Sequence, residues 1–167
     1  MTTVVEKYSL GARIFHWIGA LLIVAAWVLI EQGESFIGLH KAVGFSFLIW
    51  TILRIVNRVI TKAPPPVPMS KLQTMVASLV HLALYVVMIA MPVTGLLGTL
   101  AEGQALSVFG LFEIAGFATV NYDLADQMIA LHKDVVWTAL LALIVAHIAG
   151  ALYHQFVVKD NLIARMR

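Results

Sequence analysis

The chain has 167 residues, of which 61% are hydrophobic and only 12% are charged, and its mean hydropathy is +0.93. Soluble domains carry about twice that share of charged residues, so the composition excludes an ordinary soluble domain and indicates a protein embedded in lipid. The chain contains no cysteine, which excludes disulfides, iron–sulfur clusters and thiol chemistry. The formal net charge is only +2 and the basic residues follow membrane topology, so we expect no nucleic-acid partner.

Four apolar segments are long enough to cross a bilayer, which takes about 20 residues in a helix. The first is too long for a signal-peptide core, and no small-residue cleavage site follows it, so we expect it to be retained. Their number and spacing predict an all-α membrane protein, an up-down-up-down bundle of four transmembrane helices that forms one domain over residues 1–167. The predicted spans are residues 10–30, 37–60, 72–97 and 128–158.

Two connectors separate these spans. The Pro-rich stretch 63–68 predicts a stiff extended linker between the second and third spans. Residues 99–127 form a longer outer connector, whose apolar centre is short for a span and is broken by glycines. We expect that centre to lie at the membrane interface, over the bundle.

Charge distinguishes the two sides of the predicted bundle. The Lys and Arg residues on one side are Lys7, Arg13, Arg54, Arg58, Lys62, Lys71, Lys159, Arg165 and Arg167. The Asp and Glu residues on the other are Glu31, Glu34, Glu102, Glu113, Asp123, Asp126 and Asp134. The positive-inside rule therefore predicts that both termini are cytoplasmic. The two remaining cations, Lys41 and Lys133, lie on the outer side, and each directly follows a histidine.

Six histidines fall inside the spans or at their ends, although almost no other polar side chain does. Ionisable residues are costly in lipid and usually face the bundle interior for a functional reason. One histidine alone would more simply be explained by a hydrogen bond between helices or by an interfacial position, but six favour a shared cofactor. They are His16, His40, His81, His132, His147 and His154.

The spacing of these histidines predicts two cross-helix pairs at two depths. His132 and His147 share the last span and lie about 22 Å apart along its axis, roughly 60° apart around it. His40 begins the second span at the outer level, and His16 lies about two turns into the first span at the inner level. A haem iron bound by histidine on both faces needs such pairs. His154, seven residues beyond His147 on the same face, is the alternative inner ligand.

Small and basic residues accompany the predicted ligands. Gly19, Gly44 and Gly150 follow His16, His40 and His147 by three or four residues. Such glycines make room either for a porphyrin edge or for close helix contact. Cations suited to haem propionates, or to lipid headgroups, are Arg13, Arg54, Lys41 and Lys133.

Several segments of the chain resemble the bacterial cytochrome b561 family of small membrane cytochromes with two b-type haems. They are YSLGARIFHW (8–17), GLHKAVGFSFLIWTILRIVNR (38–58), HLALYVVMIAMPVTG (81–95) and LHKDVVWTALLALIVAHIAGALYHQFVVKDNLIARM (131–166). The resemblance implies two haem b groups in a bacterial inner-membrane protein. In related cytochrome b subunits the ligands come from spans one, two and four. Carried over by position, these ligands are His16 and His147 for the inner haem and His40 and His132 for the outer haem.

The expected activity is electron transfer, because iron with two histidine ligands has no open position for oxygen. The resemblance implies an oxidoreductase that passes electrons to or from ubiquinone, and some members of the family are described as superoxide:ubiquinone oxidoreductases. His81 and His154 remain without iron, and we expect them either to hydrogen-bond a quinone and carry its proton or to bridge helices. The outer surface is acidic apart from Lys41 and Lys133, which disfavours steering of the superoxide anion except at those two lysines.

Two other functions fit parts of the sequence. A haem-bearing anchor subunit for a separate dehydrogenase or soluble cytochrome would explain acidic outer loops, which suit a basic partner. A histidine-lined transporter for a transition metal would be colourless, and the near absence of acidic residues within the spans disfavours a cation pathway.

Overall fold

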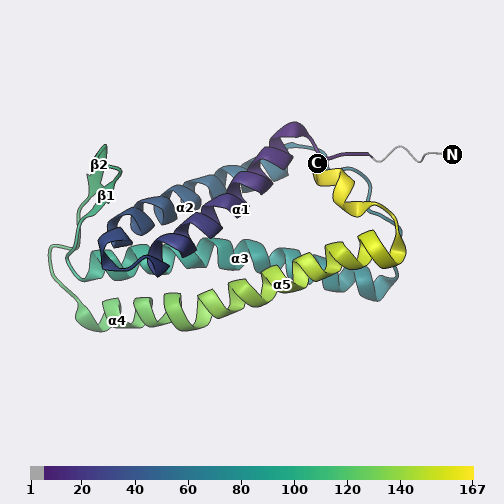
Figure 1. Cartoon of the computed structure of the whole chain (residues 1–167). Helices are drawn as coiled ribbons and strands as arrows, with labels where there is room; N and C mark the ends of the chain where they lie inside the picture. The colour runs from purple at the N-terminus through teal and green to yellow at the C-terminus, as the bar shows by residue number, and fades with distance from the viewer. Residues whose placement is uncertain (1–5) are drawn as a thin grey trace.

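The computed structural model describes residues 6–167 and consists mainly of long helices (Figure 1). The first two are α1 (Leu10–Glu31) and α2 (Ile37–Ile60), joined through a short 3₁₀ turn, and the third is α3 (Lys71–Ala101). The fourth span begins with α4 (Tyr122–Ala130) and continues without a break through a π-helical turn at Leu131–Val136 into α5 (Trp137–Tyr153). Each of the four spans is long and apolar enough to cross a membrane. The predicted four-span helical bundle is therefore confirmed.

The helix starts are set by side chains that accept hydrogen bonds from otherwise free backbone N–H groups. Ser9 accepts from the amide of Ala12 at the start of α1. Ser70 and Gln73 form a reciprocal capping box at the start of α3. Asn121 accepts from Leu124 and so begins the fourth span at Tyr122, earlier than the expected residue 128.

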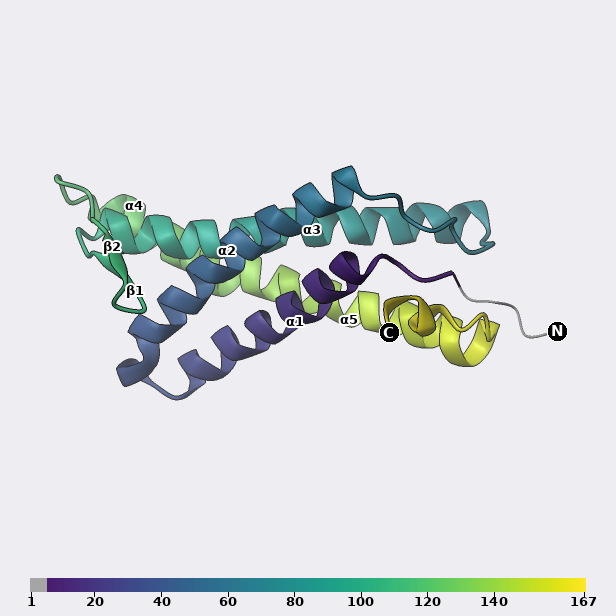
Figure 2. The same cartoon turned by 90° about the horizontal axis from the view of Figure 1, so that it is seen from above.

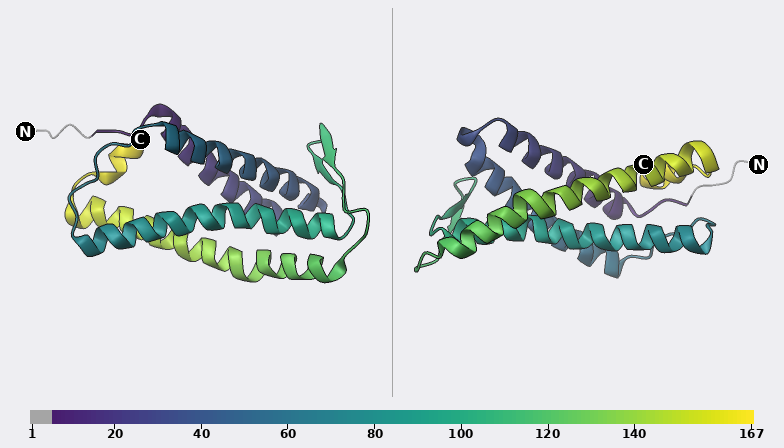
Figure 3. Two further views of the ribbon diagram at one scale, coloured as in Figure 1. Left: turned by 180° about the vertical axis from the view of Figure 1, so that it is seen from behind. Right: turned by 90° about the horizontal axis from the view of Figure 1, so that it is seen from below.

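The two ends of the bundle differ in structure (Figure 1). Both described ends of the chain lie at one end, the terminal end, and a β-hairpin lies at the other, the hairpin end. The helix α1 packs on α2, α2 on α3, and α3 on α4 and α5. Figures 2 and 3 show the α1–α2 pair inclined to α3 and the fourth span. Histidines near opposite ends of these helices are thereby placed at different depths.

A small core lies midway along the bundle. Phe47, Met88 and Leu140 are nearly fully buried there, one each from α2, α3 and α5. Residues of α1, including Leu22, pack against the same cluster. All four spans therefore meet in one apolar layer between the two ends.

The outer connector folds into a hairpin of β1 (Leu106–Val108) and β2 (Phe112–Ile114). The sequence predicted an interfacial segment but no strands. The segments before and after the hairpin cross closely, where a Cβ on Gly116 would lie 2.3 Å from the carbonyl carbon of Gly103. Only glycine fits there, and Gly103 itself has a φ of +77°. Strand β1 of the hairpin packs against α2.

The C-terminal residues form a clasp, which we define as residues 154–167, over the terminal end. The buried Arg165 donates hydrogen bonds to the carbonyls of Glu6 (3.1 Å) and Pro65 (2.5 Å). The indole of Trp17 donates to the carbonyl of Met166 at 2.8 Å. The clasp therefore ties the N-terminal segment, α1 and the Pro-rich linker together.

Candidate functional site

The hairpin end brings the rings of His40 of α2 and His132 of the fourth span close together. Their ring centroids are 6.1 Å apart, with the planes nearly perpendicular at 89°. Two imidazoles that bind one metal ion from opposite sides, with bonds of about 2.0–2.1 Å, have centroids roughly 6 Å apart. This pair therefore has the separation of two axial ligands.

Backbone carbonyls fix the tautomer of both rings. Nδ1 of His40 lies 2.8 Å from the carbonyl oxygen of Ala26, and Nδ1 of His132 lies 2.8 Å from that of Met91. A carbonyl oxygen can only accept, so each Nδ1 carries a proton and donates it. Each neutral ring then keeps a free lone pair on Nε2, which is the atom that a metal needs.

The π-helical turn Leu131–Val136 contains His132 itself. A π turn makes i→i+5 hydrogen bonds, holds one more residue than an α turn, and occurs often at functional sites. It changes the direction in which His132 projects relative to His147 on the same span. The spacing of His132 and His147 predicts an unbroken α-helix, and the π turn is a departure from that prediction.

The terminal half of the bundle holds a cluster of three histidines. His16 of α1 and His147 of α5 have ring centroids 6.1 Å apart, the same separation as in the first pair. His81 of α3 lies closer to His147, at 5.3 Å and edge-on. That distance is shorter than two opposed ligands of one metal ion require, so the geometry favours His16 over His81 as the partner of His147.

Arg54 of α2 joins this inner cluster. Its guanidinium donates to Nδ1 of His16 at 3.3 Å and lies 5.6 Å from the ring centre of Tyr85. Because a guanidinium can only donate, Nδ1 of His16 accepts, and the proton of the neutral ring sits on Nε2. Metal binding at Nε2 therefore requires that proton to move from Nε2 and Arg54 to release its hydrogen bond to Nδ1.

His154 is held apart from the inner cluster. Its ring is buried, and Nδ1 lies 2.5 Å from the carboxylate of Asp160 within the C-terminal clasp. Its ring packs on Tyr153 rather than on another histidine. The structure thus brings His16, His81 and His147 together and leaves His154 as a contact inside the clasp.

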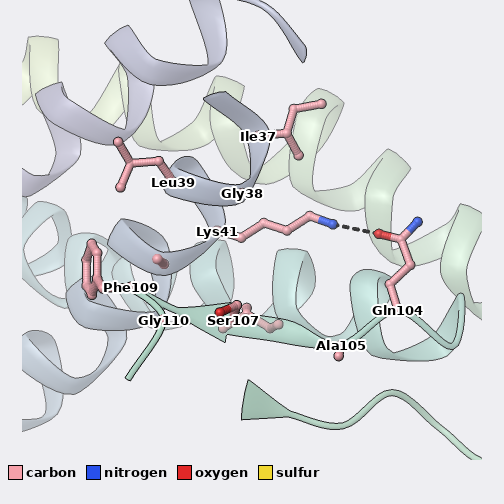
Figure 4. A pocket seen from close by; sticks show the side chains of 11 residues that line it. Ile37, Gly38, Leu39, Lys41, Gln104, Ala105, Ser107, Phe109 and Gly110 are labelled. Carbon is pink, nitrogen blue, oxygen red and sulfur yellow. Dashed lines mark hydrogen bonds between the residues drawn. The ribbon is translucent and has the colours of Figure 1, made fainter. Parts of the chain in front are cut away.

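Other predicted site residues divide between the two ends. Arg13 donates to the main-chain carbonyl of Arg167, and its Nε is buried without a hydrogen-bond partner among the described residues. Lys41 donates to the side chain of Gln104 at 2.9 Å, across a pocket of about 510 Å³ between the start of α2 and the hairpin (Figure 4). Lys133 is exposed at the same end. Lys41 and Lys133 therefore lie at the hairpin end with the His40–His132 pair, and Arg54 contacts His16 in the terminal half.

The glycines near three of the predicted ligands differ in their surroundings, because a Cβ on Gly19 would lie 3.6 Å from Trp50 and 3.8 Å from Arg54. A Cβ built on Gly44 or Gly150 would meet no atom within 4 Å. In the part of the chain that the structure describes, no three or more His, Asp or Glu side chains are grouped to hold a metal ion. Opposed pairs without further ligands suit a metal that brings its own equatorial donors, as haem does. The residues present therefore fit haem.

Known proteins are similar to this chain along nearly its whole length. The family model described as prokaryotic cytochrome b561 matches residues 7–167. Cytochrome b561 homolog 2 of Escherichia coli is 30% identical, with 99% of this chain and 93% of that protein aligned. A protein of Yersinia pestis described as probable superoxide oxidase CybB is also 30% identical, with 96% of each chain aligned. The chain therefore belongs to the prokaryotic cytochrome b561 family of membrane electron-transfer proteins, which bind b-type haem.

Proposed function

We propose that this protein carries two b-type haems and passes electrons across a bacterial inner membrane to or from ubiquinone. His40 and His132 would hold the outer haem, and His16 and His147 the inner haem. The observation that carries the proposal is the repeated 6.1 Å separation of two histidine pairs, each drawn from two different spans. The apolar layer of Phe47, Met88 and Leu140 separates the two pairs.

Each haem, when bound, supplies one-electron oxidation and reduction. The chain's own residues hold the two groups at fixed depths and exclude water between them. With two imidazoles holding each haem, no site would remain for oxygen to bind iron. Arg13 and Arg54 at the terminal end, and Lys41 and Lys133 at the hairpin end, supply charge for the propionates.

His81 is our candidate for proton transfer with quinone at the inner haem. Its Nδ1 donates to the carbonyl of Ala77 at 2.7 Å, which leaves Nε2 free to exchange a proton. His81 is exposed rather than buried. It contacts His147, so a quinone bound to His81 would lie beside the inner haem. We assign His154 a structural role in the clasp instead, because Asp160 occupies its Nδ1.

The proposed orientation places the terminal end in the cytoplasm. Both described ends of the chain lie there (Figure 1), together with most of the basic residues. The hairpin end then faces the outer side, where Lys41 and Lys133 provide the only lysine or arginine charges among the described residues. The name of the relative in Yersinia pestis supports superoxide as the electron donor there.

A second candidate function is that of a haem-bearing subunit that receives electrons from a separate protein. The acidic side chains of the hairpin end favour it, because Glu31, Glu34, Glu113, Asp123, Asp126 and Asp134 are all exposed. Such a surface suits a basic soluble partner.

One experiment separates these functions. The purified full chain is analysed for haem by the pyridine haemochrome method, then mixed with enzymatically generated superoxide and a soluble ubiquinone analogue. We expect two haems per chain and rapid quinone reduction without another protein. Two haems without reduction would support the subunit function, and a chain with no haem or a single haem would contradict the proposal itself.

A further inference from the structure

The segment Met91–Gly95 of α3 forms a cradle around the imidazole of His132, although α3 provides none of the four proposed iron ligands. Three different groups of this segment approach the ring. The Met91 carbonyl accepts from Nδ1, the Thr94 hydroxyl lies 3.3 Å from the same nitrogen, and the backbone of Gly95 faces the ring.

Glycine at position 95 allows this close approach. A Cβ there would lie 3.0 Å from Cε1 and 3.1 Å from Nδ1 of His132. Because the ring is already bonded to Met91, it cannot move aside without stretching that hydrogen bond. The sequence shows no glycine one turn from His132 on its own helix, and the structure supplies one from the neighbouring helix.

The Thr94 hydroxyl is itself held in place. It donates to the backbone carbonyls of Ala90 (2.8 Å) and Met91 (3.0 Å). Its oxygen is therefore directed at the ring nitrogen as a second acceptor for the Nδ1 proton. When one nitrogen of an imidazole binds a metal, hydrogen bonds from the other nitrogen fix the orientation of the ring and raise its basicity.

We infer that Met91, Thr94 and Gly95 are positioning residues for the outer haem: they set the tautomer and ring plane of His132 and strengthen its Nε2 as a donor to iron. This inference rests on the proposed function. A stronger donor stabilises the oxidised iron and lowers the reduction potential of the haem it binds.

Gly95→Ala is the first test, with Gly38→Ala as its matched control. A Cβ on Gly38, also within a span, would meet nothing within 4 Å. We expect Gly95→Ala either to reduce the haem content from two toward one per chain or to raise the midpoint potential of the outer haem. The outer haem is identified as the redox wave that disappears in His132→Ala.

Thr94→Val is the second test, in case Gly95→Ala does not fold. Its control is Thr138→Val, which removes a hydroxyl bonded to the carbonyl of Asp134 (2.7 Å) with no imidazole beside it. We expect Thr94→Val to keep both haems and to change the midpoint potential and the low-spin ferric EPR signal of the outer haem alone. The control should leave both signals as in the wild type.

The outcomes separate this inference from the function on which it rests. A wild-type chain without haem would overturn the proposed function. If the wild type carries two haems and His132→Ala loses one, unchanged potentials and EPR signals in both cradle variants would overturn this inference alone. This inference would also be overturned if Gly95→Ala and Thr94→Val changed only the redox wave that disappears in His147→Ala.

Discussion

The two histidine pairs have the same ring separation but differ in how ready they are to bind iron. At the hairpin end both rings donate Nδ1–H to a backbone carbonyl. A carbonyl oxygen can only accept a hydrogen bond, so both Nε2 atoms stay free of protons. At the terminal end Arg54 donates to His16, which keeps the proton on Nε2 of that ring. In the proposed function, the outer pair would be organised before haem binds, whereas the inner pair would have to rearrange.

The two pairs therefore have the same ring separation but differ in their hydrogen-bond partners and in the charge beside them. A permanent cation beside the inner pair disfavours the extra positive charge of oxidised iron, and carbonyl acceptors beside the outer pair favour it. We therefore expect the outer haem to have the lower potential. Electrons would then pass from the outer haem to the inner one and toward quinone.

The largest expected effect is loss of a haem. His132→Ala should leave only the inner haem, and His147→Ala only the outer one, because an axial ligand is removed in each. Pyridine haemochrome analysis would show a fall from two haems to one, and redox titration would show which wave remains. If both variants lost the same redox wave, His132 and His147 would not hold separate haems.

His81→Ala should separate proton transfer from iron binding at the inner site. We expect both haems to remain, because His81 is too close to His147 to oppose it across one ion. Quinone reduction should slow by about 10²-fold, the usual contribution of a positioned acid or base. Stopped-flow reduction of a ubiquinone analogue measures this rate, and loss of a haem would instead make His81 a ligand.

Arg54→Gln should lower the midpoint potential of the inner haem, because it removes a positive charge beside His16. The outer wave should stay in place, since its pair lies at the other end of the bundle. Arg58→Gln is the matched control, being exposed and one turn along the same helix. A shift of the outer wave, or an equal shift in the control, would argue against a local effect of Arg54.

Arg165→Gln should have the smallest effect, and on stability alone. It weakens charge-assisted hydrogen bonds to Glu6 and Pro65, which are worth about 1.5–3 kcal/mol each. Thermal unfolding in detergent should begin at a lower temperature, with both haem spectra unchanged. Arg167→Gln is the control, because that side chain is exposed and only its main-chain carbonyl is bonded.

The helices could be predicted from the sequence because length and hydropathy determine what can cross a bilayer. The second span was predicted at its observed bounds, 37–60. The hairpin at 106–114 was not predicted, because its strands have only three residues each and depend on the glycine crossing at Gly103 and Gly116.

The candidate site could be predicted only in part. Helical spacing was enough to propose the two pairs that the structure brings together. It could not show that Met91, Thr94 and Gly95 surround His132, since these contacts join segments about forty positions apart in the chain. The sequence also could not show that Arg13 donates a hydrogen bond to the carbonyl of Arg167, because these distant residues meet only when the clasp folds over the terminal end.

The π-helical turn at Leu131–Val136 lets the fourth span absorb a change in length. Because this turn holds one more residue than an α turn, deletion of one residue within it would let the helix close into regular α geometry with little rotation of the segments on either side. Deletion of one residue in α5 between the turn and His147 would instead rotate His132 by about 100° relative to His147, because regular α-helix has no extra residue to lose. A single-codon deletion would thus uncouple the two halves of the span only when it falls outside the turn.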